Sequence, residues 1–325
     1  MRVFITGEQG FIAKNLRKSY ESVGHTVVSD EILDTVARIK TGEMCVHRNG
    51  EDVWENVFKS CNIDLVVHNA AVVGTDVVAL DPSESSNSNV IGTYNICRAA
   101  QKSDTKVCYM GTSVIYDTPK FQHRVILEDS ERGPRTLYGA LKLSGEHIVK
   151  SHCANWTIMR PLFAFGGVGD MNSLIAKTFF AEKNQVEKID MFLDPAKTKD
   201  YIHVTDFCDA VVLGSTSKLA NNNDFNISAQ TPRNVGEIVD IMSEMMKCDV
   251  NKRITWHPQT DYLGNHMLSS KKFRTLFGWT PTFTLEEGIA TALEEIVSSN
   301  DSTYNPLKHL EDAAEKDIDL TQFYN

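Results

Sequence analysis

The sequence lacks long apolar runs, low-complexity tracts and internal repeats. No run approaches the roughly 18 apolar residues of a membrane helix. Hydrophobic residues make up 42% and charged residues 23% of the 325 residues, which are ordinary values for a globular protein. These features exclude fibrous and largely disordered chains, and we expect no membrane partner.

Positive charge is also scarce, because 33 lysines and arginines stand against 43 acidic residues and leave a net charge of -10. The chain as a whole therefore does not attract nucleic acid or anionic lipid, and an anionic ligand would need local cations. Met1 leads directly into a strand-like stretch, without the basic and apolar regions of a secretory signal. We expect a cytoplasmic protein with no nucleic-acid partner.

Patterns for disulfides and metal ions are missing as well. The seven cysteines are odd in number and form no CxxC pair, and the ten histidines show no metal-ligand spacing. We therefore expect no disulfide framework and no metal site, and we expect most cysteines to be buried and reduced.

What the sequence does contain is a regular alternation of strand-like and helix-like segments up to Pro161. A helix that starts at Phe11 and ends before Gly24 follows the first strand, and further helices are predicted at 51–61, 86–102 and 137–151. The predicted strands are 2–6, 25–30, 63–71, 106–110 and 157–160. This order predicts an α/β fold with a Rossmann-type, doubly wound parallel sheet.

After Pro161 the alternation loosens and the loops lengthen. We expect residues 162–299 to form mainly a smaller C-terminal substrate-binding lobe, and we assign to it helices near 205–218, 234–247 and 285–298 and a strand at 225–228. Residues 1–161 form the predicted sheet domain, to which some later segments return. The polar residues 300–325 are predicted to be a frayed or surface-docked tail.

The turn after the first strand has the chemistry of a phosphate-binding loop. In TGEQGFIA, Gly7 and Gly10 allow a tight turn close to a pyrophosphate, and Ala13 allows close packing of the helix on the sheet. The helix that starts with Phe11 and Ile12 offers free amides and its positive end to the phosphates. We therefore predict a dinucleotide site at these residues; the alternative is an ordinary strand-to-helix turn.

Asp30 ends the second predicted strand, where a carboxylate can accept hydrogen bonds from the ribose hydroxyls of a dinucleotide. A 2'-phosphate would be repelled there, so Asp30 favours NAD over NADP. Because Glu31 and Asp34 lie nearby, Asp30 is alternatively a turn or cap residue.

Tyr138 and Lys142 are four residues apart and therefore share one face of a predicted helix. An ammonium beside a phenol stabilises the phenolate, so the pair can exchange a proton with a substrate hydroxyl while hydride leaves the same carbon. Thr112, just past a buried strand, can hydrogen-bond the reacting oxygen, and Ser113 competes for this role. The alternative is a pair on a surface helix.

Taken together, these segments resemble the extended short-chain dehydrogenase/reductase family, in its NAD-dependent epimerase/dehydratase branch. The resemblance covers nearly the whole chain. TGEQGFIA is similar to TGxxGFIG, and DLVVHNAA, NVIGTYN and YGALKLSGE are similar to DxVxHLAA, NVxGTxN and YGxSKxxxE. In the second half, MRPLFAFG, KDYIHVTDFCDAV and FGWTPTFTLEEGI are similar to LRxxNxYG, RDFIHVxDxxxAI and LGWxPxxxLxEGI.

The resemblance implies that Tyr138 transfers the proton, that Lys142 binds the nicotinamide ribose and lowers the tyrosine pKa, and that Thr112 takes the Ser/Thr place. It implies a homodimer formed through helices 89–100 and 138–149. Within NVIGTYN we expect Asn89 to be a buried polar brace and Gly92 a close-packing position. The expected NAD contacts are completed by Ala70, Ala71, Asn89 and Pro161.

Departures from the family pattern narrow the reaction. Ser113 and Val114 stand where sugar 4,6-dehydratases carry Asp-Glu, which argues against elimination of water. Decarboxylating relatives and 3,5-epimerases need an acid or a cysteine at the position of Val114. Chemistry at one carbon remains: NAD-dependent epimerisation of a nucleotide-activated sugar, or alternatively ketone reduction by a 4-ketoreductase. A non-catalytic dinucleotide-sensing protein is a third hypothesis.

The expected substrate contacts are Ser113, Phe163 and Lys199, and two of them are unusual. Phe163 stands where the family often has an asparagine, and Lys199 stands where it has an arginine. Lysine cannot copy the bidentate guanidinium fork. Either a diphosphate is bound differently here, or the substrate is not a usual nucleotide sugar.

Overall fold

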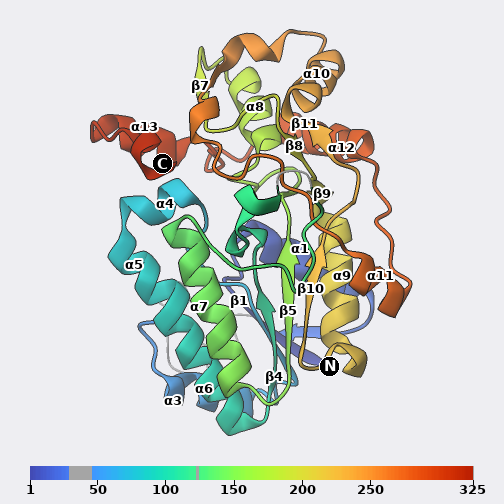
Figure 1. The fold of residues 1–325 in the computed structure, drawn as a ribbon. Helices are drawn as coiled ribbons and strands as arrows, with labels where there is room; N and C mark the ends of the chain where they lie inside the picture. The colour runs from blue at the N-terminus through green and yellow to red at the C-terminus, as the bar shows by residue number, and fades with distance from the viewer. Residues whose placement is uncertain (29–45, 122–123, 325) are drawn as a thin grey trace.

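A computed structural model describes residues 1–28, 46–121 and 124–324 of the chain. A single parallel sheet dominates the N-terminal part of the fold (Figure 1). Among the described residues its strand order is β10-β5-β4-β3-β1-β2. The strands are β1 (Arg2–Thr6), β2 (Thr26–Val28), β3 (Leu65–His68), β4 (Lys106–Met110), β5 (Trp156–Pro161) and β10 (Asn223–Ile227). The predicted Rossmann-type sheet is confirmed.

Helices cover both faces of this sheet (Figure 1). One face carries α1 (Phe11–Ser22) and α9 (Val204–Thr216), and the other carries α3 (Glu51–Ser60), α6 (Thr93–Ser103) and α7 (Leu137–His152). Side chains of β1 alternate between the faces, as the pleat requires. Val3 and Ile5 enter the core under α1 and α9, whereas Phe4 enters the core under α3 and α6.

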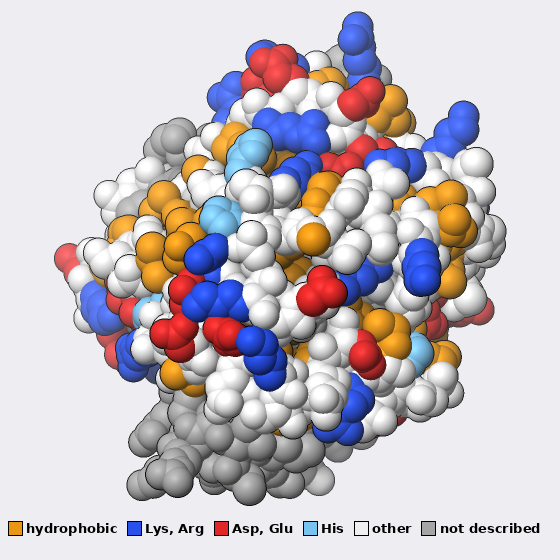
Figure 2. Space-filling model, turned by 90° about the horizontal axis from the view of Figure 1, so that it is seen from below, with side chains coloured by type: hydrophobic (Ala, Val, Ile, Leu, Met, Phe, Trp, Pro, Cys, Tyr) orange, Lys and Arg blue, Asp and Glu red, His pale blue; other side chains and the backbone are white. Residues whose placement is uncertain are grey.

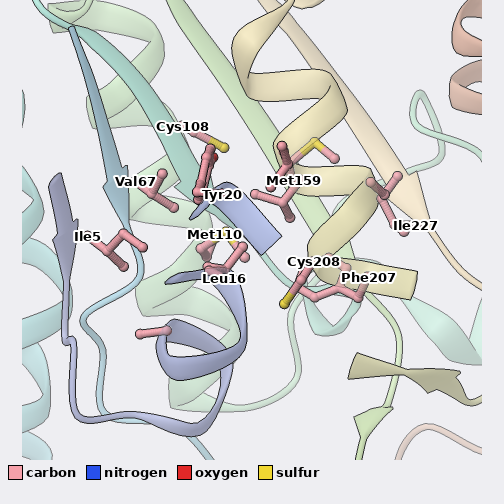
Figure 3. Packing of buried hydrophobic residues seen from close by; sticks show 14 of the residues in the cluster. Ile5, Leu16, Tyr20, Val67, Cys108, Met110, Met159, Phe207, Cys208 and Ile227 are labelled. Atoms are coloured by element: carbon pink, nitrogen blue, oxygen red, sulfur yellow. The ribbon is translucent and has the colours of Figure 1, made fainter. Parts of the chain in front are cut away.

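Figure 3 shows the first of these cores, where Leu16 and Tyr20 of α1 meet Phe207 and Cys208 of α9 above the strands. Within the described residues six cysteines are free thiols, and five of them are buried, as expected. No helix of the described chain is both long enough and apolar enough to cross a membrane. The face of the molecule in Figure 2 carries acidic and basic side chains next to one another.

The second lobe is built from helices α8 (Leu174–Lys183), α10 (Val235–Met246) and α12 (Leu285–Ser298) around their own apolar core. Three short strand pairs complete it: β6 (Ala164–Phe165) with β9 (Ile202–His203), β7 (Ile189–Met191) with β12 (Ile254–Trp256), and β8 (Thr198–Lys199) with β11 (Arg233–Asn234).

The remaining helical elements connect or flank these two parts. They are α4 (Thr75–Leu80), α5 (Pro82–Ser86), η1 (Asn87–Gly92), η2 (Ser113–Ile115), η3 (Thr118–Phe121), η4 (Lys218–Ala220), η5 (Val250–Arg253), η6 (Pro258–Thr260), α11 (Lys271–Phe277), α13 (Lys308–Glu315) and η7 (Leu320–Tyr324).

Two sequence-based assignments are wrong in their place in the fold. The strand predicted at 225–228 is β10, which joins the main sheet beside β5 and not the second lobe. The helix predicted at 205–218 is α9, which packs against α1 under the same sheet. Both are local apolar patterns whose partners lie far away in the chain, so the patterns gave the type of element but not its neighbours. The division into domains at Pro161 stays a prediction.

The predicted helix 86–102 is also more complex than expected. It consists of the π-helical turn η1 followed by α6, and α5 precedes it. A Cβ at Gly92 would lie 2.5 Å from a methyl group of Val46, which confirms the expected close packing at this position.

Candidate functional site

The glycine turn lies at the carboxyl ends of β1 and β3. Gly7 has a φ of +71°, and a Cβ there would lie 2.9 Å from the Cα of Ala70, so a side chain is excluded on two grounds. The Gly10 amide donates to the Gly7 carbonyl at 2.9 Å and closes the turn. The segments that follow β1 and β3 are therefore in direct backbone contact at Gly7 and Ala70. Ala71 is the next residue after this contact.

A buried hydrogen-bond chain fixes these strand ends. The Thr6 hydroxyl oxygen accepts from the amides of Asn69 and Ala70, so its own proton is free to go to Nδ1 of His68 at 2.8 Å. Nε2 of His68 then donates to Thr93 at 3.0 Å. Burial lowers the pKa of His68 to about 3, so the imidazole stays neutral and one tautomer fits both contacts.

Asn89 confirms the expected polar brace. Its side-chain oxygen accepts from the Val72 amide at 2.7 Å, and its side-chain nitrogen donates to the Val72 carbonyl at 2.9 Å. Because Val72 engages both polar atoms, Asn89 holds the loop that carries Ala70 and Ala71 and does not itself offer an obvious group to the cofactor. The expected direct NAD contact of Asn89 stays a prediction.

The start of α1 fits a dinucleotide pyrophosphate. Its N-cap is Gly10, which provides no side-chain cap, so the amides of the first turn are not satisfied by a capping side chain. The side chains of Phe11 and Ile12 point into the packing around the first core, so these two residues would contact phosphates through their backbone. Asp30, predicted to bind the ribose, lies outside the described residues.

Tyr138 stands in the first turn of α7, next to the loop after β4. The Thr136 hydroxyl caps this helix by accepting from the Gly139 amide at 3.2 Å. A Cβ at Gly139 would lie 2.7 Å from the Val114 carbonyl oxygen, so only glycine allows α7 to start this close to η2. The Tyr138 and Thr112 side chains consequently lie close to one another at the wall of one cavity.

The pKa of the Tyr138 phenol is raised well above its ordinary value. Burial is the main cause and nearby Tyr262 adds to it, while the hydrogen bond with Thr112 opposes them. The family resemblance implies a lowered pKa through Lys142, but the Lys142 ammonium lies over the ring of Tyr109, 4.3 Å from its centre. Burial lowers the pKa of Lys142 itself to about 8, against the attraction of Glu146.

A buried ion pair that sequence reasoning missed joins α7 to the sheet. Arg160 of β5 donates to both carboxylate oxygens of Glu146 at 2.7 and 2.8 Å, and both side chains are buried. Arg160 also donates to Asp224 of β10 at 2.6 Å and to the Tyr116 hydroxyl at 2.9 Å. The pair ties α7 to β5. The final glutamate of the YGALKLSGE motif, Glu146, was the feature of the sequence that could have pointed to this ion pair.

A cavity of about 270 Å³ opens beside Tyr138. The predicted residues Thr112, Ser113, Pro161 and Phe163 line it. Lining residues that sequence reasoning did not single out come from α4, α8, β7 and the loops after β7 and η6: Asp76, Lys177, Asp190, Phe192 and Tyr262. Asp261, just after η6, lines the cavity as well. The structure therefore brings Tyr138, Thr112 and residues of the C-terminal lobe together around one space. No group of three or more potential metal ligands occurs in the described part of the chain.

Phe163 adopts an unusual backbone conformation at the cavity wall. Its φ is +40°, in the region where asparagine is tolerated and aromatic residues are rare. Its ring stacks on Tyr201 with centres 5.2 Å apart. The backbone thus keeps a conformation suited to asparagine, while the Phe163 side chain forms part of the cavity wall. Its contact with the substrate stays a prediction.

Lys199 does not take its predicted role. It is fully buried and does not line the cavity; its ammonium pairs with Asp261 at 2.8 Å and donates to the Gly264 carbonyl. Lys199 therefore neutralises Asp261 from behind the cavity wall. The sequence pattern predicted a cation in this segment but could not show that Asp261, 62 residues further along the chain, would pair with it.

Comparisons with known proteins agree with this geometry. The model of the "NAD dependent epimerase/dehydratase family" matches residues 3–228. A GDP-6-deoxy-D-talose 4-dehydrogenase from Aggregatibacter actinomycetemcomitans is 29% identical, with 75% of this chain and 80% of that protein covered. A UDP-glucose 4-epimerase from Halalkalibacterium halodurans is 24% identical over 87% of this chain and 91% of that protein.

Among solved structures, the UDP-glucose 4-epimerase of Thermotoga maritima with UDP-glucose superimposes with a TM-score of 0.78 at 21% identity, covering 91% of this chain and 98% of that one. The family match covers most of the chain, and the shared fold and the glycine turn at Gly7 agree with it. The chain belongs to the NAD dependent epimerase/dehydratase family of extended short-chain dehydrogenases/reductases, and its cofactor is NAD.

Proposed function

We propose that this protein epimerises a nucleotide-activated sugar at one carbon, by oxidation to a ketone and reduction from the other face. The observation that carries the proposal is that Thr112 and Tyr138 line the same cavity, and that Ser113 and Val114 follow Thr112 in its wall. These residues can move one proton at one oxygen, and Val114 offers no acid for elimination. The relatives named as UDP-glucose 4-epimerases support this reading.

In the proposed reaction NAD supplies a reversible hydride acceptor. Thr112 holds the substrate oxygen against Tyr138, and Tyr138 takes the hydroxyl proton during oxidation and returns it during reduction. Lys142 contributes positive charge next to the site. The backbone at Gly7 and the start of α1 hold the pyrophosphate, and the aromatic wall at Phe163 excludes water from the reacting carbon.

A 4-ketoreductase is the second candidate, and two observations favour it. The raised pKa of Tyr138 keeps the phenol protonated, which is the form that donates a proton to a ketone. The relative from A. actinomycetemcomitans is named a 4-dehydrogenase of a GDP-deoxysugar. This reaction would use Thr112 and Tyr138 once per turnover.

Cofactor analysis separates the two candidates. An epimerase is expected to retain NAD through purification and to interconvert UDP-glucose and UDP-galactose without added NADH. A reductase is expected to consume one NADH per ketosugar reduced. Tyr138→Phe should lower either rate by about 10²- to 10⁴-fold while leaving NAD binding intact. Full function with Tyr138→Phe would favour a non-catalytic NAD-sensing protein.

We also propose a homodimer through α6 and α7. Ile91 in η1 and Tyr94 in α6 support it, because they are 47% and 39% exposed although they are large and apolar. Light scattering coupled to gel filtration tests this: the double variant Ile91→Glu/Tyr94→Glu should run as a monomer, and an unchanged mass would contradict the proposal.

A further inference from the structure

The C-terminal segment connects the two lobes. Tyr304 and Leu307 are buried in the core of the second lobe, and the Tyr304 hydroxyl donates to the Asp170 carbonyl at 3.0 Å. The following α13 and η7 then contact α4, beside the sheet domain. Figure 1 shows α13 next to α4 at the junction of the lobes. The segment therefore docks at the edge of the cavity that α4 and α8 help to form.

His309 of α13 lies in a cluster with one residue from each of those helices. Its Nε2 is 2.8 Å from Oδ2 of Asp76 in α4 and 3.3 Å from Nζ of Lys177 in α8. A carboxylate cannot donate, so the short contact requires that Nε2 carries the proton and donates to Asp76. Nε2 then has no lone pair for Lys177, and the N–H groups of that ammonium remain available.

Asp76 and Lys177 both line the cavity, whereas His309 stands behind them. Asp76 uses Oδ1 to accept from the Val77 amide at 2.9 Å and keeps further lone pairs. Side by side, a carboxylate and an ammonium offer an acceptor and a donor. Neighbouring hydroxyls of a sugar ring, each both donor and acceptor, match such a pair.

A diphosphate matches this wall less well. Lys177 is the one lysine or arginine that lines the cavity among the described residues, and it already faces Asp76. Asp190 and Asp261 line the same cavity. Lys199 neutralises Asp261, and Lys177 already faces Asp76, so the lining offers no excess positive charge. A dianion would therefore gain little there and would be repelled by the Asp190 carboxylate, whereas a neutral sugar ring would not be repelled.

We propose that Asp76 and Lys177 form a sugar-hydroxyl subsite, and that His309 is a positioning residue that makes the C-terminal segment part of the substrate site. This inference rests on the proposed function, because it assumes a sugar nucleotide in the cavity. It adds which part of the substrate the wall at α4 and α8 binds, and which residue outside the cavity fixes that wall.

Titration calorimetry on the NAD-loaded full-length protein tests the inference with paired probes: UDP-glucose against UDP, and GDP-mannose against GDP. His309→Leu and Lys177→Met should weaken the sugar nucleotide that binds by about tenfold, as expected for loss of a hydrogen bond to a charged group, and weaken the matching diphosphate less than about twofold. His309→Gln keeps a donor for Asp76 and should restore most of the affinity. Lys316→Met, at an exposed position just after α13, is the control.

The paired probes distinguish the possible failures. If His309→Leu weakens the sugar nucleotide and the diphosphate equally, or weakens neither, the subsite is overturned while the proposed function stands. If the wild-type protein binds no sugar nucleotide, the proposed substrate class is wrong and the subsite falls with it. Hydrogen exchange of residues 75–80 in His309→Leu provides a second readout: unchanged protection there would also contradict a positioning role.

Discussion

The Lys142 ammonium packs against the face of the Tyr109 ring, with Nζ 4.3 Å from the ring centre. Both side chains are buried, and the Tyr109 hydroxyl donates to the Lys142 carbonyl at 3.4 Å. The ring quadrupole returns part of the hydration energy that the cation loses on burial. The hydration energy that is not returned disfavours the charged form and lowers the pKa of Lys142 to about 8. Lys142 therefore titrates near physiological pH.

This titration predicts a pH dependence of NAD binding. Lys142 is protonated below about pH 8 and neutral above it, and only the charged form makes charge-assisted hydrogen bonds to the cofactor. NAD affinity should therefore fall about tenfold as the pH rises from 7 to 9, measured by calorimetry. Lys142→Met should bind weakly and show no such step. A wild-type affinity that does not change over this range would contradict the assignment.

The glycine turn predicts a sharp difference between two left-handed glycines. Gly7→Ala should abolish measurable NAD binding, because its Cβ would lie 2.9 Å from the Ala70 backbone at the pyrophosphate site. Gly24→Ala is the matched control: its φ is +83°, but no atom lies within 4 Å of the added Cβ. It should cost about 1 kcal/mol of stability and leave NAD affinity unchanged. Equal effects of both variants on NAD binding would refute the steric argument.

Removal of one partner from the buried pair of Arg160 and Glu146 should lower the stability of the fold strongly. Arg160→Met leaves the Glu146 carboxylate buried without its partner, and the free energy of unfolding in urea should fall by about 3–5 kcal/mol. Adding Glu146→Leu should recover a large part of this loss. The exposed pair of Lys59 and Glu55 is the control, because Lys59→Met should change stability little. No recovery in the double variant would show that packing, not charge, dominates.

The lowered pKa of Asp76 predicts that the contact between α4 and α13 contributes less to the free energy of unfolding at low pH. Burial raises its pKa, but the His309 hydrogen bond and the Lys177 charge outweigh burial and lower it from 3.8 to about 2. A lowered folded-state pKa stabilises the fold above about pH 4, and this contribution of about 2 kcal/mol is lost as the pH falls towards 2. Between pH 5 and pH 3 the wild type should lose about 1 kcal/mol more than Asp76→Asn does.

Urea unfolding at the two pH values measures this difference. Asp240→Asn, at an exposed position on α10, serves as the control. Its loss of unfolding free energy between pH 5 and pH 3 should equal that of the wild type. If Asp76→Asn loses as much stability on acidification as the wild type, the junction is not held by the Asp76 charge.

Sequence patterns were sufficient where a function depends on neighbours along the chain. The turn from Gly7 to Gly10 and the pair Tyr138 and Lys142 are set by spacing on one strand-turn-helix and on one helix. Thr112 was predicted because parallel strands end at a common edge, which is a rule about sheets and not about particular partners. The structure has the glycine turn where it was predicted and brings Thr112 and Tyr138 to one cavity, whereas the Lys142 ammonium lies over Tyr109. The roles of these residues stay predictions.

Sequence patterns failed where a role depends on a distant partner. Lys199 looked like a substrate cation, and only the fold shows that Asp261, 62 residues further on, neutralises it. His309 had no distinguishing pattern, since its significance comes from Asp76 and Lys177 in two other helices. The direction of the Tyr138 pKa was missed for the same reason, because burial is a property of the assembled lobes.

The position of β10 at the outer edge of the sheet has a consequence for biogenesis. While the ribosome is still synthesising the second lobe, β5 has an open edge of unpaired amides and carbonyls, and Met159 and Ile158 lie in that strand. The nascent sheet is completed only when Ile227 has emerged. A fragment ending at Pro161 would keep the unpaired edge of β5 permanently. We therefore expect such a fragment to aggregate unless the later segment that contains β10 is present.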